Sequence, residues 1–170
     1  MSKKELKKYL HGLKKEQLEE QLLDLYARFR EVKVYYDFVF NPREEKLIEE
    51  CKFKIEKEYF PPGNRKPKAR RSVAHRYIRH FMRLGMAPEL IADAMLYNLE
   101  TAQKFSARKA VRQEVFYISM LRSYQEARDY IADWNLGLSF RTRLQAIAEQ
   151  AWEQEWFNRV SFDTGGIQMS

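Results

Sequence analysis

The chain has 170 residues, which is enough for one domain with a sizeable core. Its eleven Phe, ten Tyr and three Trp exclude a disordered chain, although 32% of the residues are charged. A single cysteine, Cys51, excludes an intrachain disulfide and a cysteine-based zinc site, and it fits a reducing compartment. No apolar run reaches the roughly 20 residues of a membrane span, and the amino terminus lacks the apolar core of a secretory signal. We therefore expect a cytoplasmic protein.

The net charge of +7 comes from one stretch of the chain. No acidic residue lies between Glu58 and Glu89, whereas the rest of the chain has 23 basic and 24 acidic residues. Such a stretch predicts a surface that attracts a polyanion or an acidic protein. Its eight cations, which we take as the candidate binding residues, are Arg65, Lys66, Lys68, Arg70, Arg71, Arg76, Arg79 and Arg83.

The amino-terminal part predicts two helices. Ser2 and Glu5 form a capping-box pattern for a short helix that Gly12 interrupts. One long helix is predicted over 15–40, because seven apolar residues recur at alternating steps of four and three. We favour packing of this stripe within the chain; a homodimer is the alternative, since about three heptads are the lower limit for a coiled coil. The stripe consists of Leu18, Leu22, Leu25, Phe29, Val32, Tyr36 and Val39.

The third predicted helix begins at Asn41-Pro42 and ends at Pro61-Pro62. Asn41 suits the capping position, and Pro42 suits the first helical position. The following loop over 61–69, with the sequence PPGNRKPKA, is rich in Pro and Gly and almost without apolar residues. We expect it to be exposed and to lie within one domain.

The stretch over 69–105 organises the rest of the chain. A basic amphipathic helix ends at Gly85, which suits the left-handed residue just past a helix end. A second helix begins at Pro88 and is apolar on most sides. Such a helix must be surrounded by others, so we place 88–105 at the centre of the fold.

Two further helices are predicted after a break at 106–109. The first covers 111–135 and ends near Gly137, and the second is capped by Ser139. No strand is predicted, so about seven helices form a single all-α domain over 1–157, as a bundle or a short stack of helical hairpins, with a loosely ordered tail over 158–170. The inward-facing candidates are Val115, Met120, Tyr124, Ala127, Ile131, Trp134, Leu144, Ile147, Ala151, Trp152 and Trp156.

Several motifs occur together in a known family. They are the run Lys33-Val-Tyr-Tyr-Asp-Phe-Val-Phe-Asn-Pro42, the turn Phe81-Met-Arg-Leu-Gly85, the helix start Pro88-Glu-Leu-Ile-Ala-Asp-Ala-Met-Leu96 and the pair Phe116-Tyr117. Over nearly its whole length the chain resembles a family of small all-helical bacterial proteins known only as a domain of unknown function. The resemblance implies an all-helical fold and a bacterial source, and it implies no activity.

The arginines of the basic helix have two interpretations. Arg76, Arg79 and Arg83 share one helical face and could bind phosphate or nucleic acid together with the loop before them. Alternatively, these arginines form ion pairs with Asp93 and Glu100, which lie on the next helix of the hairpin. We expect Arg76 and Arg79 to be partly paired in this way, and we expect residues 65–71 to have no internal partner.

The sequence gives little support for a metal site or for a DNA-binding helix-turn-helix motif. His75 and His80 lie roughly 140° apart around a helix, so we predict no metal site, and no cofactor motif is present. A DNA-reading helix-turn-helix needs a turn soon after Ala92, where the apolar helix instead continues. Cys51 lies on the apolar side of its helix and is assigned no chemistry.

We therefore expect a non-catalytic binding or scaffolding module that contacts an acidic protein or a polyanion through residues 65–83. The alternative is a small helical enzyme built on Asp93, Tyr97 and Glu100, because buried carboxylates can have raised pKa values, with Arg76 and Arg79 as anion clamps. A homo-oligomeric structural protein that associates through the Leu18–Val39 stripe is a third hypothesis.

Overall fold

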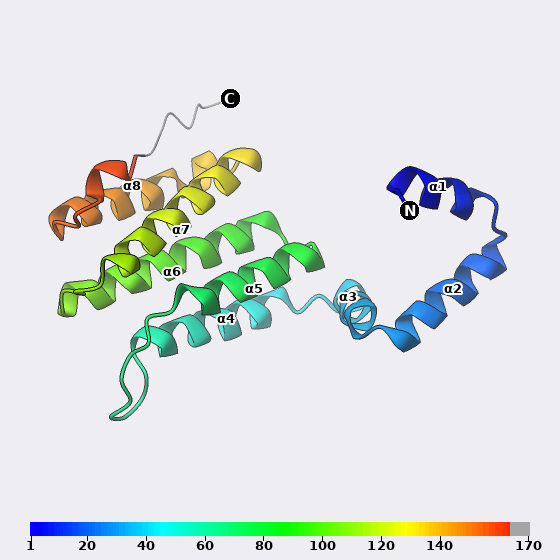
Figure 1. Ribbon diagram of the computed structural model, residues 1–170, viewed down its shortest axis with the longest axis horizontal. Coiled ribbons are helices and arrows are strands. Elements are labelled where there is room, and N and C mark those ends of the chain that lie inside the picture. The colour runs from blue at the N-terminus through cyan, green and yellow to red at the C-terminus, as the bar shows by residue number, and fades with distance from the viewer. Residues whose placement is uncertain (164–170) are drawn as a thin grey trace. The chain divides into compact units, whose positions relative to one another are not determined.

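The computed structural model describes residues 1–163, and this range is helical with no strand (Figure 1). The all-α prediction is confirmed, with eight α-helices in the described range. The chain divides after Arg43 into two compact units. The single domain predicted over 1–157 stays a prediction. The first unit contains α1 (Lys3–His11), α2 (Lys15–Arg28) and α3 (Arg30–Phe40); the second contains α4 (Glu44–Tyr59), α5 (Arg71–Leu84), α6 (Pro88–Arg108), α7 (Glu114–Asp133) and α8 (Gly137–Glu153).

The centre of the second unit is α6, as predicted. It contacts α4 and α5 on one side and α7 and α8 on the other (Figure 1). Ala94, Leu96 and Leu99 are fully buried. Pro88 occupies the first turn, where its missing N–H costs nothing, and the Ala87 N–H donates to the Glu44 carboxylate at 2.9 Å. None of the five charged residues of α6, which are Glu89, Asp93, Glu100, Lys104 and Arg108, is among its buried side chains.

Polar groups also lie inside the contact between α6 and α8. The Gln103 amide donates to the Ile147 carbonyl at 2.7 Å, and the Ser106 hydroxyl donates to the Gln154 side-chain oxygen at 2.6 Å. The Gln154 amide donates in turn to the Gln103 carbonyl at 3.1 Å. Each buried group that lacked such a partner would cost about 1–3 kcal/mol, so this network fixes the lengthwise position of α8 on α6.

The connections of the second unit place two loops at the same end. Gly85 ends α5 in the left-handed conformation, with φ of 72°, and α6 runs back beside α5. The short connection over 109–113 then reverses the chain into α7 (Figure 1). In this up-and-down arrangement the α4–α5 loop over 60–70 and the α6–α7 connection lie at one end of the helices.

The long helix predicted over 15–40 is wrong, because it is two helices that meet at Phe29. Phe29 is extended, with φ of −114° and ψ of 115°. Its N–H donates to Leu25 at the end of α2, while its carbonyl accepts from Val32 at the start of α3. One residue thus serves both helix ends, and the apolar spacing continues across the break. The first unit buries no side chain within its helices, and Leu22 and Phe29 are 41% and 50% exposed.

Several helix ends differ from the predicted positions. The capping box of Ser2 and Glu5 is confirmed. By contrast, α4 begins at Glu44, two residues after the predicted Pro42, and Gly137 is the first residue of α8, so Ser139 does not cap it. Three of the predicted inward side chains are instead mostly exposed, and these are Val115, Trp134 and Trp152. They lie near helix ends, where few neighbours cover them.

The chain beyond α8 packs against α7 before the described residues end. The Asn158 amide donates to the Tyr117 carbonyl at 2.9 Å, and Phe162 is buried against Tyr124 and Trp156. A short 3-10 helix covers Arg159–Ser161. The rest of the tail predicted as loosely ordered, residues 164–170, lies outside the described residues.

Replacing a leucine of α6 tests the central position of this helix. Leu99→Ala should lower the free energy of unfolding by about 2–5 kcal/mol, because Leu99 is fully buried and the change leaves a cavity. Leu138→Ala is the matched control, since Leu138 is 84% exposed. Urea unfolding followed by tryptophan fluorescence reports on the second unit, which contains all three tryptophans. Equal losses in the two variants would contradict the central role of α6.

Candidate anion-binding site

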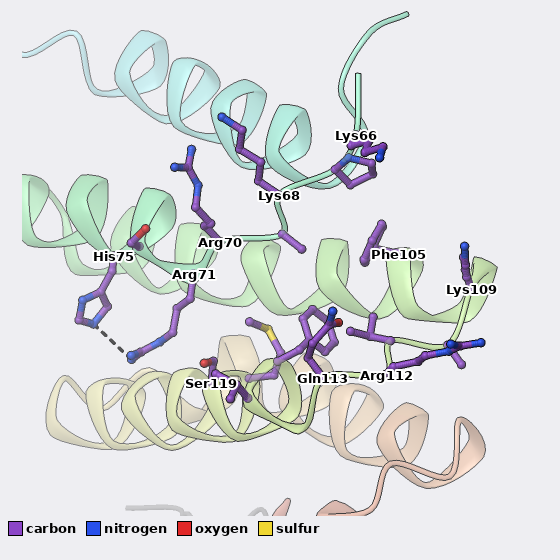
Figure 2. A pocket seen from close by; sticks show the side chains of 18 residues that line it. Lys66, Lys68, Arg70, Arg71, His75, Phe105, Lys109, Arg112, Gln113 and Ser119 are labelled. Atoms are coloured by element: carbon purple, nitrogen blue, oxygen red, sulfur yellow. Dashed lines mark hydrogen bonds between the residues drawn. The ribbon is translucent and has the colours of Figure 1, made fainter. Parts of the chain in front are cut away.

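A large concavity of the second unit lies at the end where the two loops meet. It has a volume of about 1280 Å³ and lies between the α4–α5 loop, the start of α5, the end of α6 and the start of α7 (Figure 2). Eighteen residues line it, and none of them is acidic. Its six cations, which define the basic pocket named below, are Lys66, Lys68, Arg70, Arg71, Lys109 and Arg112.

Four of the six cations are free to meet a ligand. Lys66, Lys68, Lys109 and Arg112 are exposed and form no ion pair within the described residues. Figure 2 shows Lys66 and Lys68 on the α4–α5 side of the pocket, and Lys109 and Arg112 on the α6–α7 side. Cations therefore lie on both connections that border the pocket, and their summed positive charge favours an anion there.

The prediction that residues 65–71 have no internal partner is wrong for Arg70. Its guanidinium donates two hydrogen bonds of 3.0 Å to the Glu58 carboxylate at the end of α4. These bonds hold the pKa of Glu58 below its ordinary value. The backbone N–H groups of Lys68 and Ala69 donate to the Glu58 carbonyl, so the same residue anchors the loop twice.

The same prediction is wrong for Arg71, which reaches across to α7. Its guanidinium donates to the Ser123 hydroxyl at 2.7 Å and pairs with Glu126 at 2.5 Å. His75 also contacts Glu126, at 3.0 Å. Burial raises the pKa of Glu126, but the hydrogen bonds from Arg71 and His75 outweigh it and the net pKa is lowered. Arg71 therefore fixes one wall of the pocket to α7.

The floor of the pocket is apolar. Phe116 is 8% exposed and Met120 is fully buried, while Phe105 is partly exposed between them and the α4–α5 loop. Val111 and Val115 stand nearer the rim, and Val115 is 70% exposed. A ligand in this pocket therefore meets positive charge at the walls and apolar surface below.

The starts of α5 and α7 both line the pocket. Arg70 and Gln113 precede these helices, and neither helix has a side-chain cap. The first backbone N–H groups of a helix lack intrahelical partners and carry partial positive charge. These two ends add to the attraction that the cations exert on an anion.

The structure divides the predicted cations into two groups. Lys66, Lys68, Arg70 and Arg71 line the pocket, whereas Arg65 is exposed and does not. Sequence reasoning missed the other two cations of the pocket, Lys109 and Arg112. They lie 38 or more residues further along the chain than Arg71. Only the up-and-down order of the helices could have indicated that they join the same site.

The predicted pairing of Arg76 and Arg79 with the acidic residues of α6 is wrong. Arg76, Arg79 and Arg83 are exposed and form no ion pair within the described residues. The reason is the rotation of α5, which contacts α6 through a different face. That buried face consists of Ala74, Ile78, Phe81 and Leu84.

Two carboxylates of α6, those of Asp93 and Glu100, pair with cations of α4 and α8. Lys52 pairs with Asp93 at 2.6 Å, and Arg143 donates to Asp93 at 2.7 Å. Arg143 also forms a two-bond fork with Glu100 at 2.8 and 3.0 Å, and Lys52 lies 5.2 Å above the ring of Tyr97. Burial raises the pKa of Asp93, but its bonds to Lys52 and Arg143 outweigh it, so the net pKa is lowered. A lowered pKa is unsuited to the proton transfer considered for an enzyme.

Cys51 is fully buried, as the apolar position on α4 predicts. Burial raises the pKa of its thiol to about 12. The thiol is therefore protonated at neutral pH and unreactive. Within residues 1–163 no three His, Cys, Asp or Glu side chains are grouped so as to hold a metal ion. None of the described helices is both long and apolar enough to cross a bilayer.

The chain belongs to a family of unknown function (DUF6155), whose model matches residues 1–166. The match confirms the resemblance to a domain of unknown function. No curated protein and no solved structure matches the chain. The family assignment extends over both units and names no ligand or activity.

The ion pairs of Asp93 predict a dependence of stability on pH. Because its folded-state pKa is below the ordinary value of about 4, Asp93 stabilises the fold above that pH and loses this effect as the pH falls through the lowered pKa. Asp93→Asn should lower the free energy of unfolding by about 1.5–3 kcal/mol at pH 7, and the difference from the wild type should shrink below pH 4. Denaturation at a series of pH values measures this.

The matched control for Asp93→Asn is Asp133→Asn. Asp133 is exposed and forms no ion pair in the part of the chain that the structure describes. Its replacement should leave the pH profile unchanged. A difference between Asp93→Asn and the wild type that stayed constant from pH 7 to pH 3 would contradict the role given to these ion pairs.

Proposed function

We propose that this protein is a non-catalytic binding or scaffolding module, and that its basic pocket receives an anionic partner, either an acidic protein surface or a polyanion. The observation that carries the proposal is the absence of any acidic residue among the eighteen that line the pocket. Four of its six cations have no ion pair within the described range. At Asp93, by contrast, the nearby cations Lys52 and Arg143 are paired with a carboxylate.

The geometry of the pocket supports binding rather than catalysis. Arg70 and Arg71 are held by Glu58 and by Glu126, so the walls are fixed before a partner arrives. The pocket contains no carboxylate to act as a general base, and its only histidine, His75, is engaged with Glu126. The proposal includes a cytoplasmic location in a bacterium, which the single buried cysteine and the resemblance of the sequence support.

Two sets of four cations test which surface binds. The pocket variant replaces Lys66, Lys68, Lys109 and Arg112 with Ser; its control replaces Arg65, Arg76, Arg79 and Arg83, which also removes four charges but lies outside the pocket. A single-stranded oligothymidylate serves as a polyanion probe, titrated at several salt concentrations. The pocket variant should bind more weakly and lose up to about 3 units of slope in log affinity against log salt, at roughly 0.7 per phosphate contact. The control should retain most of the wild-type slope.

Equal losses in the two variants would contradict a pocket-centred site, because they would show that only total charge matters. Wild-type binding by the pocket variant together with loss in the control would move the site to the exposed face of α5.

The homo-oligomer remains a second candidate function, favoured by the exposed apolar side chains of the first unit. Leu18, Leu22 and Leu25 are 37%, 41% and 42% exposed, and an exposed apolar row is typical of a protein contact. Light scattering should then give a mass near twice 20.5 kDa. Leu22→Gln should lower the mass toward that of one chain, whereas Leu138→Gln, in the second unit, should not. A single-chain mass for the wild type at high concentration would refute this candidate.

A further inference from the structure

The lining of the basic pocket is as apolar as it is charged. Eight of its eighteen residues are apolar, and six of these are at least partly exposed, whereas Phe116 and Met120 are buried. A ligand that offered only charge, such as polyphosphate, would leave the exposed apolar lining, above all Val115, in contact with water. Removing apolar surface from water contributes roughly 25 cal/mol for each Å² covered, so a ligand with an apolar group would bind more tightly.

The aromatic residues of the floor are poorly arranged for nucleic-acid bases. Phe105 and Phe116 contact each other with ring centroids 6.3 Å apart and planes at 58°. Phe105 also contacts Tyr59 and Phe60, and Phe116 contacts Trp156. With Phe116 only 8% exposed, its ring has no open face on which a base could stack. Single-strand binding proteins depend on such open faces.

The cations stand on two sides of the apolar floor. Lys66 and Lys68 belong to the α4–α5 loop, and Lys109 and Arg112 to the α6–α7 connection (Figure 2). The best-matched ligand has an apolar group in the middle and anionic groups on both sides of it. A peptide with aliphatic side chains between Glu or Asp residues has this chemistry, and Arg112 can form a two-bond fork with a carboxylate.

We propose that the basic pocket binds an acidic segment of a partner protein, in which an aliphatic side chain covers the exposed apolar lining at Phe105, Val111 and Val115 while flanking carboxylates meet the Lys and Arg residues of both connections. This inference rests on the proposed function and selects the acidic protein over the nucleic acid or polyphosphate. Val115 is the residue expected to contact the aliphatic group, because it is exposed at the rim of the pocket.

The test compares two capped hexapeptides by isothermal titration calorimetry with the full chain. One reads Glu-Glu-Leu-Leu-Glu-Glu, and the other has Ser in place of both Leu. They carry the same charge and differ only in the apolar centre. We expect the Leu peptide to bind roughly tenfold more tightly or better, since burying a single Leu side chain is worth about a tenfold change in affinity.

Two single substitutions on α7 locate the apolar contact. Val115→Ser should weaken the Leu peptide about three- to fivefold and leave the Ser peptide unchanged. Ile118→Ser is the matched control, because Ile118 is 40% exposed on the same helix but does not line the pocket. Both positions are exposed, so neither change should unfold the protein.

The outcomes separate this inference from the proposed function. Equal, salt-sensitive binding of the two peptides would retain the anion-binding pocket and overturn the apolar-anchor inference. Tighter binding of the oligothymidylate than of the Leu peptide would also overturn it, in favour of nucleic acid. If none of the anionic probes bound, both proposals would fail.

Discussion

The second unit depends on one constraint: α6 must be covered along its whole length. Four helices supply the cover, and no other helix of the described chain buries so many side chains. Because the interior contains no free charge, ionic groups are confined to the outer faces and the ends of the bundle. Asp93 and Glu100 are tolerated on α6 only at its half-exposed edge, where Lys52 and Arg143 reach them.

The same constraint produces the basic pocket. Helices that run alternately up and down along α6 bring the α4–α5 and α6–α7 connections to one end, and both connections are rich in Lys and Arg. The ion pairs of Arg70 with Glu58 and of Arg71 with Glu126 then hold the α4–α5 loop against α4 and α7. A cationic surface that is spread over distant parts of the sequence thus becomes a single concave site.

Sequence reasoning succeeded where a local signal decides the structure. The apolar character of α6, the left-handed Gly85 and the capping box of Ser2 each depend on neighbours within a few residues. It failed at Phe29, since neither Gly nor Pro marks the break and the apolar spacing continues through it. It failed also for the ion pairs, because the partners of Asp93 are Lys52 on α4 and Arg143 on α8, which are distant in the sequence and meet it only through the rotation of each helix. Four of the six cations of the pocket were predicted, and Lys109 and Arg112 were missed because their position depends on topology.

The Cys51 thiol can report how often α4 separates transiently from the rest of the second unit. Its thiol is covered completely and its pKa is about 12, so a thiol-directed reagent cannot react with it while α4 stays in place. The thiol therefore reacts only during a fluctuation that separates α4 from α6 and exposes Cys51. With no second cysteine in the chain to compete, the rate of modification measures how often that separation happens, and it does so in a chain with no engineered label.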